Sequence, residues 1–242
     1  MAQAIVLNNI DHHDLRLRTD RDATGDSLNQ VLVFPTEFLE LQREYAIFFR
    51  RDDDGRFQSV ALLGLDKDEN LFLGEEGGRT VWTARYVPAL LERGPFSIGL
   101  DKGTSGPDDA VILVDPEHPL ISRTEGEALF RPHGGNSPRL ERITRVLQTI
   151  HQGIEVSNVM FEAFVAANLI AQLEVDLRLD DVTSYKLPDL FTISADALRA
   201  LDATTLQSLN RQGFLALAHY VLASHGNLAR LIEMKNLRRA HS

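Results

Sequence analysis

The chain contains no cysteine among its 242 residues. It therefore forms no disulfide framework, zinc–thiolate site or iron–sulfur cluster, and it has no thiol nucleophile. Basic residues are also in deficit, because 25 lysines and arginines face 35 acidic residues and leave a net charge of −10. Nucleic acids and anionic lipids attract basic proteins, so this charge argues against a nucleic-acid partner and against binding to a membrane surface.

Long apolar runs are missing as well. The most apolar stretch covers residues 159–173, but Glu162, Asn168 and Gln172 interrupt it, and a membrane-spanning helix needs about 20 apolar residues. The first residues, MAQAIVLNNIDHHDL, contain neither a basic region nor an apolar run of the length found in signal peptides. We therefore expect a cytoplasmic protein with no membrane insertion.

The composition is that of a folded globular protein, with 43% hydrophobic and 25% charged residues. Short strand-like runs dominate the first half of the chain. Residues 45–49 and 57–63 are two such runs, and the Asp54-Gly55 pair between them is typical of a tight hairpin turn. Thr36 is expected to cap a helix over residues 37–43.

The second half of the chain has a mostly helical pattern. Pro138 suits a first helical position, and the apolar residues that follow it repeat with helical spacing. Clean alternation of apolar and polar residues over 174–179 predicts a strand with one solvated face, and residues 190–193 are expected to form its return strand.

Two short helices are expected near the end of the chain, capped by Ser194 and by Thr204 or Thr205. Together these patterns predict an α+β fold. Residues 1–130 are expected to form an antiparallel, curved or barrel-like β region, and residues 131–242 a largely helical region, with both packed as one unit.

Several short segments, read in order, form a set known from one family. They are Pro35-Thr36-Glu37-Phe38, Tyr45-Ala46-Ile47-Phe48-Phe49, Leu62-Leu63-Gly64-Leu65, Glu69-Asn70-Leu71-Phe72, Trp82 through Tyr86-Val87-Pro88, Arg93-Gly94-Pro95-Phe96, Gly126-Glu127-Ala128-Leu129-Phe130, Arg211-Gln212-Gly213-Phe214-Leu215, Tyr220 and Ser224-His225-Gly226-Asn227-Leu228. With these segments the chain resembles the bacterial SapC-like family over nearly its whole length. It departs from the usual pattern at Ala46, where proline is common, and at Gly94, where a larger residue is usual.

The resemblance implies a setting more than a reaction. The family takes its name from a protein linked to a bacterial surface layer. Its members are often found beside TonB-dependent outer-membrane receptors, flavin-dependent halogenases and cupin-like proteins. The resemblance therefore implies a role in the capture or modification of nutrients and not in a structural lattice. A peptide-transport permease shares the name, but the present chain has no apolar run long enough to be one.

Trp82, Tyr86 and Arg93 form the most suggestive group of side chains. If residues 84–92 are helical, Tyr86 and Arg93 are seven positions apart and project from the same side, with Trp82 just upstream. An aromatic-walled pocket with one cation suits an acidic, aromatic or peptide ligand. We expect these residues to line a concavity between the two regions, and packing of Trp82 in the core is the alternative.

Glu37 and Asn70 are two further candidates for contact with a ligand. Glu37 is either an early helix acid favoured by the helix dipole or a buried carboxylate that orients Arg93 or Arg211. Asn70 either ends a turn by adopting a left-handed conformation or offers its amide to a ligand.

His12 and Asp14 form a His-x-Asp pattern, which supplies two ligands of the facial triad that holds non-haem iron. The pattern is weak, and a polar role at a strand edge or turn is the alternative. The chain has no phosphate-binding loop, no nucleophile elbow and no zinc-protease motif, so we expect no metal and no other cofactor. A third metal ligand would come from one of five more distant histidines, His118, His133, His151, His219 or His225.

These observations favour a noncatalytic protein that binds a small molecule, a peptide or a protein partner in a bacterial nutrient-uptake or surface-associated system. The first alternative is an oxygenase-like metal enzyme that uses His12 and Asp14. The second is an accessory protein of a surface layer.

Overall fold

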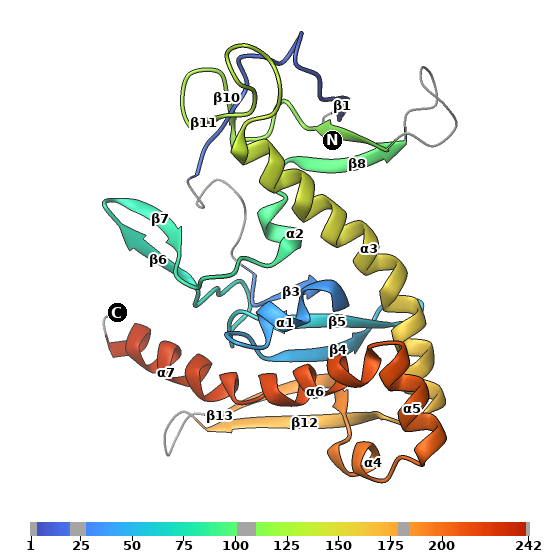
Figure 1. Ribbon diagram of the computed structural model, residues 1–242. Coiled ribbons are helices and arrows are strands. Elements are labelled where there is room, and N and C mark those ends of the chain that lie inside the picture. The colour runs from blue at the N-terminus through green and yellow to red at the C-terminus, as the bar shows by residue number, and fades with distance from the viewer. Residues whose placement is uncertain (1–3, 20–27, 101–109, 179–183, 241–242) are drawn as a thin grey trace. The chain divides into compact units, whose positions relative to one another are not determined.

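The computed structural model describes residues 4–19, 28–100, 110–178 and 184–240 (Figure 1). Contacts divide the chain into two compact units, each assembled from separate segments of the sequence. The predicted boundary at residue 130 falls inside unit 1, and the packing of the two predicted regions as one unit stays a prediction. Unit 1 consists of Met1–Asp26, Leu73–Thr83 and Ala89–His151, and unit 2 of Ser27–Phe72, Ala84–Pro88 and Gln152–Ser242.

Unit 1 is built from short antiparallel strands around an apolar core. Its buried residues include Leu15, Phe96 and Leu129, which pack with Leu140 and Ile143 of a long helix. One three-stranded sheet has the order β1 (Ile5–Val6), β9 (Ala110–Val114), β8 (Phe96–Leu100). A second has the order β10 (Ile121–Ser122), β2 (Arg16–Leu17), β11 (Glu127–Ala128), and β6 (Leu73–Glu76) forms a hairpin with β7 (Arg79–Trp82).

A buried carboxylate in unit 1 joins two helices, α2 (Ala89–Glu92) and α3 (Pro138–Ala166). The Glu92 side chain is only 4% exposed, and its Oε1 lies 3.2 Å from Arg139 Nη1 and 3.0 Å from Arg142 Nε. A buried charge without a partner is strongly destabilising, so these two arginines fix α2 on the first turns of α3. Pro138 begins α3 as predicted, and the Ser137 hydroxyl before it accepts a hydrogen bond from the Leu140 amide.

Two predicted helices differ from the structure. The helix expected over residues 84–92 is limited to Ala89–Glu92, because Pro88 lacks an amide hydrogen and restricts the residue before it to extended conformations. The helix expected over residues 37–43 is a 3₁₀ turn, η2 (Pro35–Glu37), followed by the single turn α1 (Phe38–Leu41). Its capping contact comes from Glu37, whose Oε1 accepts a hydrogen bond from the Phe34 amide, and not from the predicted Thr36.

Unit 2 contains a five-stranded antiparallel sheet. The Asp54-Gly55 hairpin between its second and third strands in sequence is confirmed, with Gly55 at a φ of +78°. The sheet ends in two edge strands, so it is open and not closed on itself. Its order is β12 (Ile170–Arg178), β13 (Ser184–Ile193), β4 (Ile47–Arg51), β5 (Phe57–Leu62), β3 (Gln30–Val33).

Helices cover both faces of this sheet. Neighbouring residues of a strand point to opposite faces of the sheet. In β4, Phe48 and Phe49 are such a pair, and both are fully buried. The Phe49 ring contacts Phe161 and Phe164 of α3, with centroids 5.0 and 6.3 Å apart. On the other face lies helix α6 (Phe214–Ser224), whose last residue accepts a hydrogen bond from the Ile47 amide through its hydroxyl.

Two shorter helices precede α6, and their caps test the predictions made for them. Ser194 caps α4 (Ala195–Arg199) as predicted, because its hydroxyl accepts a hydrogen bond from the Ala197 amide. Helix α5 (Ala203–Arg211) is capped by Asp202 and not by a threonine. The Asp202 carboxylate accepts hydrogen bonds from the amides of Thr204 and Thr205, and aspartate is favoured over threonine at this position.

The α+β class and the antiparallel pairing are confirmed. The strands of the second half are longer than predicted, because β12 and β13 together pair from Ile170↔Ile193 to Arg178↔Ser184. Helix α7 (Asn227–Ala240) ends the described chain. Within that described part, no helix combines the length and apolar composition needed to cross a bilayer.

His225 packs against the five-stranded sheet and makes the stability of unit 2 sensitive to acid. The imidazole stacks on Phe48 with centroids 4.8 Å apart, and its Nε2 lies 3.0 Å from the Thr192 hydroxyl. Burial lowers the pKa of His225, and a backbone hydrogen bond with Ile47 opposes this only to a lesser extent. The unfolded chain therefore takes up a proton at a higher pH than the folded chain does.

We expect the free energy of unfolding to fall as the pH drops through about 6.5, the ordinary pKa of histidine. His225→Gln removes the titrating group, so part of this acid sensitivity should disappear in urea unfolding curves recorded across that range. His219→Gln, at an exposed position of α6, the helix that ends just before His225, is the control and should keep it. Equal slopes for His225→Gln and the unaltered protein would contradict the assignment.

Candidate functional site

Glu37 is a buried carboxylate in unit 2, only 2% exposed. Its Oε2 accepts a hydrogen bond of 2.9 Å from the Tyr86 hydroxyl, and its Oε1 accepts one of 3.0 Å from the Phe34 amide. The burial agrees with the interpretation of Glu37 as a buried carboxylate, which was expected to orient Arg93 or Arg211. The observed partners are a phenol and a backbone amide, whereas Arg211 is an exposed residue of α5.

The segment around Tyr86 is held by its backbone as well as by its side chain. Glu44 accepts hydrogen bonds from the amides of Arg85 and Tyr86, and the Tyr45 hydroxyl donates to the Tyr86 carbonyl. Glu37, Glu44 and Tyr45 therefore attach residues 84–88 to unit 2. Their observed contacts serve to position this segment.

The other two members of the predicted pocket belong to unit 1. Trp82 lies on β7 opposite Leu73 and is half-buried. Arg93 follows α2, and its guanidinium donates to the Phe96 carbonyl at 2.9 Å. Since the predicted helix does not reach Tyr86, the helical spacing that placed Tyr86 and Arg93 on one side was wrong. A shared concavity for the three residues stays a prediction.

His12 and Asp14 each have a partner of another kind. His12 is buried, and its Nδ1 accepts a hydrogen bond from the Asn8 amide at 3.1 Å. Asp14 pairs with Arg123, and this hydrogen bond is the main cause of the lowered pKa of Asp14. Among the residues that the structure describes, no three histidines or acidic residues are grouped so that they could hold a metal ion.

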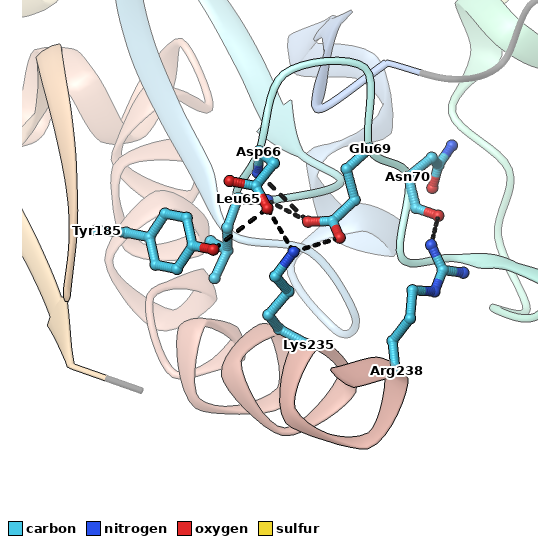
Figure 2. Close-up of polar contacts among 7 residues, drawn as sticks. All are labelled: Leu65, Asp66, Glu69, Asn70, Tyr185, Lys235 and Arg238. Carbon is cyan, nitrogen blue, oxygen red and sulfur yellow. Dashed lines mark hydrogen bonds and ion pairs between the residues drawn. The ribbon is translucent and has the colours of Figure 1, made fainter. Parts of the chain in front are cut away.

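Asn70 belongs to the loop of residues 63–72 that follows β5, here called the 63–72 loop (Figure 2). Its side chain is buried, and Oδ1 accepts a hydrogen bond from the Phe72 amide at 3.0 Å. The preceding residue, Glu69, has the same role, because its Oε2 accepts hydrogen bonds from the amides of Leu65 and Asp66. Both side chains therefore stabilise the turn from within. Asn70 does not adopt the left-handed conformation of the first interpretation, which is found instead at Asp68, with a φ of +59°.

Helix α7 contacts this loop through Lys235, whose side chain is 10% exposed. Figure 2 shows its ammonium between two carboxylates, with Nζ 2.5 Å from Asp66 Oδ2 and 2.6 Å from Glu69 Oε1. The Tyr185 hydroxyl of β13 donates to the same Asp66 oxygen at 3.2 Å. We call Asp66, Glu69, Tyr185 and Lys235 the Lys235 cluster. One turn further along α7, Arg238 donates to the Asn70 carbonyl at 3.0 Å.

The Lys235 cluster has fixed charges near neutral pH. Burial lowers the pKa of Lys235, but its hydrogen bonds with Asp66 and Glu69 outweigh this, and the pKa is raised. Burial and the neighbouring Asp66 charge raise the pKa of Tyr185. Lys235 therefore stays protonated and Tyr185 neutral at pH 7, so neither is suited to accept a proton there. This arrangement fastens α7 to the 63–72 loop.

A groove lies between α3 and α5 in unit 2, with a cavity volume of about 550 Å³. The α3 side offers small and apolar residues together with the charged Glu162, and Val159 among them is 50% exposed. The α5 side offers hydroxyls and an amide, above the buried Leu209. We call this feature the α3–α5 groove, and its lining residues are Val159, Glu162, Ala163, Ala166, Ala167, Thr204, Thr205, Ser208, Leu209 and Gln212.

Sequence reasoning missed both the groove and Lys235. Thr204, Ser208 and Gln212 recur every four residues, and such a polar stripe on a helix is visible in the sequence. Val159, Ala163 and Ala167 have the same spacing. That these two stripes face each other depends on the packing of α3 against α5, which no local pattern indicates.

Comparisons with known proteins give one match. The sequence model of the SapC family matches residues 7–231, which is nearly the whole chain. No curated protein and no solved structure matches the chain.

Proposed function

Because the chain belongs to the SapC family, we propose that it acts by binding a protein partner, without catalysis, in a bacterial nutrient-uptake or surface-associated system. The observation that carries this proposal is the α3–α5 groove, an open cavity of about 550 Å³ with one apolar and one polar wall. Cavities of this size with a few placed polar groups are typical of binding sites.

The two walls favour a helical segment of a partner protein as the occupant. Each wall presents a row of residues at intervals of four along its own helix, and an amphipathic helix can lay its apolar face along such a row. Apolar residues of that helix would contact Val159, Ala163 and Ala166, and its polar residues would face the threonines of α5.

Charge favours a basic partner. Glu162 is the charged residue among the described lining residues, and its side chain is exposed. The net charge of the whole chain is −10. Complementary charge steers partners and selects among them. We therefore place a lysine or arginine of the partner helix opposite Glu162.

Contacts within unit 2 hold both walls of the groove, and a preformed site lowers the cost of binding. Along α5 and its two caps, the Thr205 hydroxyl donates to the Asp202 carboxylate at 2.6 Å, and the side-chain amide of Gln212 donates to the Ser208 hydroxyl at 3.0 Å. On α3, Phe164 packs against Phe214 of α6 with centroids 6.4 Å apart. The groove is therefore preformed by interactions internal to unit 2.

Site-specific cross-linking tests the proposal. A benzophenone amino acid replaces Ser208 in the groove or, as a control, Leu237, which is 62% exposed on α7. In bacterial cells that produce the protein naturally, irradiation should give one discrete adduct with a second protein from position 208 and none from position 237. The adduct identifies the partner, and an uptake or surface-associated protein is expected.

Two variants make the experiment specific to the groove. Glu162→Arg should reduce the adduct about tenfold, because like charges then face each other, and Ala163→Trp should abolish it by filling the cavity. Glu233→Arg, an equal charge reversal on α7, should leave it unchanged. The absence of an adduct at position 208, or an adduct insensitive to Glu162→Arg and Ala163→Trp, would overturn the proposal.

A further inference from the structure

A second cavity, in unit 1, has a different chemistry. Its volume is about 390 Å³, and two of its lining residues are arginines. Arg18 follows β2, and Arg79 is the first residue of β7. The described lining residues are Arg18, Thr19, Arg79, Glu125 and Gly126.

The guanidinium groups in this cavity form few and weak contacts with the described part of the protein. Arg18 Nε lies 3.9 Å from Glu125 Oε2, a long contact between side chains that are 41% and 72% exposed. Such an exposed pair contributes little to stability. The Arg79 guanidinium has no hydrogen bond or ion pair with any residue that the structure describes. Among the described lining residues, two cations therefore face one carboxylate, in a chain whose total charge is −10.

The backbone around Arg18 is tightly fixed. The Arg18 amide donates to the Leu120 carbonyl at 2.8 Å, and Arg16 donates to the Gly126 carbonyl at 3.0 Å. Gly126 has a φ of +99°, and a Cβ at this position would lie 2.3 Å from the Leu17 carbonyl oxygen. Only glycine lets this loop approach β2 so closely, so the cavity wall has a defined position.

We propose that this cavity binds a small organic anion through a carboxylate or phosphate group held by Arg18 and Arg79. Guanidinium groups form paired hydrogen bonds with both kinds of oxyanion. The Thr19 hydroxyl would donate or accept a hydrogen bond at the remainder of the molecule, and the Glu125 carboxylate would accept one. A cavity of about 390 Å³ is within the range of small-molecule sites, and a bare inorganic ion would leave most of it to water.

Isothermal titration calorimetry with three probes tests this inference. Citrate supplies carboxylates, glucose 6-phosphate supplies an organic phosphate, and inorganic phosphate is the bare ion. At least one organic probe should bind, more tightly than inorganic phosphate, and added salt should weaken the binding. Citrate alone, or glucose 6-phosphate alone, would show which oxyanion the site selects.

Arginine variants locate the binding. Arg79→Ala should weaken it at least about tenfold, because one of the two guanidinium groups is lost. Arg56→Ala removes an arginine that is 76% exposed and paired with Asp54 in unit 2, and it should have no effect. The inference is overturned if neither organic probe binds at about 10 mM, if inorganic phosphate binds as tightly, or if both variants act equally.

This inference is independent of the partner proposed for the α3–α5 groove. Arg79→Ala should leave the cross-link from position 208 unchanged. A loss of anion binding and a loss of the adduct are therefore separate results.

Discussion

Lys235→Met is expected to lower the free energy of unfolding by about 3 kcal/mol. Methionine keeps most of the apolar side chain but removes the ammonium between Asp66 and Glu69. The Glu69 side chain is 12% exposed, so its charge loses its partner without becoming solvated. The amides of Leu65 and Asp66 still donate to Glu69, which keeps the loss at the lower end for a broken buried pair. Urea unfolding followed by circular dichroism measures the change.

The matched control for this variant is Lys67→Met, at an exposed position of the same loop. It should change the stability by no more than about 0.5 kcal/mol. The raised pKa of Lys235 adds a pH signature. Its stabilisation is complete below the pKa of an unfolded lysine, about 10.4, and is lost as the pH rises through the folded value. Lys235→Met should lack this component of the alkaline loss, and equal losses for Lys235→Met and Lys67→Met would contradict the importance of the cluster.

Gly64→Ala is expected to cost a similar amount, about 3 kcal/mol, at the upper end for overpacking. A Cβ on Gly64 would lie 2.0 Å from the Glu69 carbonyl oxygen and 2.8 Å from its carbon. Both are backbone atoms, so the 63–72 loop has to move. The movement displaces Glu69 from Lys235 and weakens the hydrogen bond from the Leu71 amide to the Leu63 carbonyl.

Gly226→Ala is the control for this steric effect. Its nearest contact would be 3.7 Å from the Ala223 carbonyl oxygen, an ordinary packing distance, so it should be neutral or slightly stabilising. The double variant Gly64→Ala, Lys235→Met should cost less than the sum of the two single changes, because both act on the same contact with Glu69. Full additivity would show that the loop moves without disturbing the Lys235 cluster.

The success of sequence-based prediction for this chain depended on how local each determinant was. The hairpin at Asp54-Gly55, the start of α3 at Pro138 and the cap at Ser194 are each set by neighbouring residues, and all three were confirmed. The helix over residues 84–92 was wrong because Pro88 breaks it and because Glu44 and Tyr45 hold residues 85 and 86. Those two partners lie about 40 residues upstream, beyond the reach of any local pattern.

The candidate site residues show the same difference between local and distant determinants. Glu37 and Asn70 were selected from the sequence as candidates for contact with a ligand, and that contact stays a prediction. The structure shows that both side chains are buried. Whether they bind a ligand cannot be inferred from residue type, because a buried carboxylate that holds a tyrosine and one that holds a ligand look alike in a sequence. Lys235 escaped notice because its acidic partners are more than 160 residues away.

The strand order of unit 2 has a consequence for synthesis on the ribosome. Strands β3, β4 and β5 are complete by residue 62, but the neighbour of β4 in the sheet, β13, ends at Ile193. Phe48 and Phe49 are covered by residues between Phe161 and His225. Until those residues emerge, the first three strands present an open edge and two uncovered aromatic faces, which other chains can join. The nascent chain therefore passes through an aggregation-prone stage that ends only when its last quarter has been made.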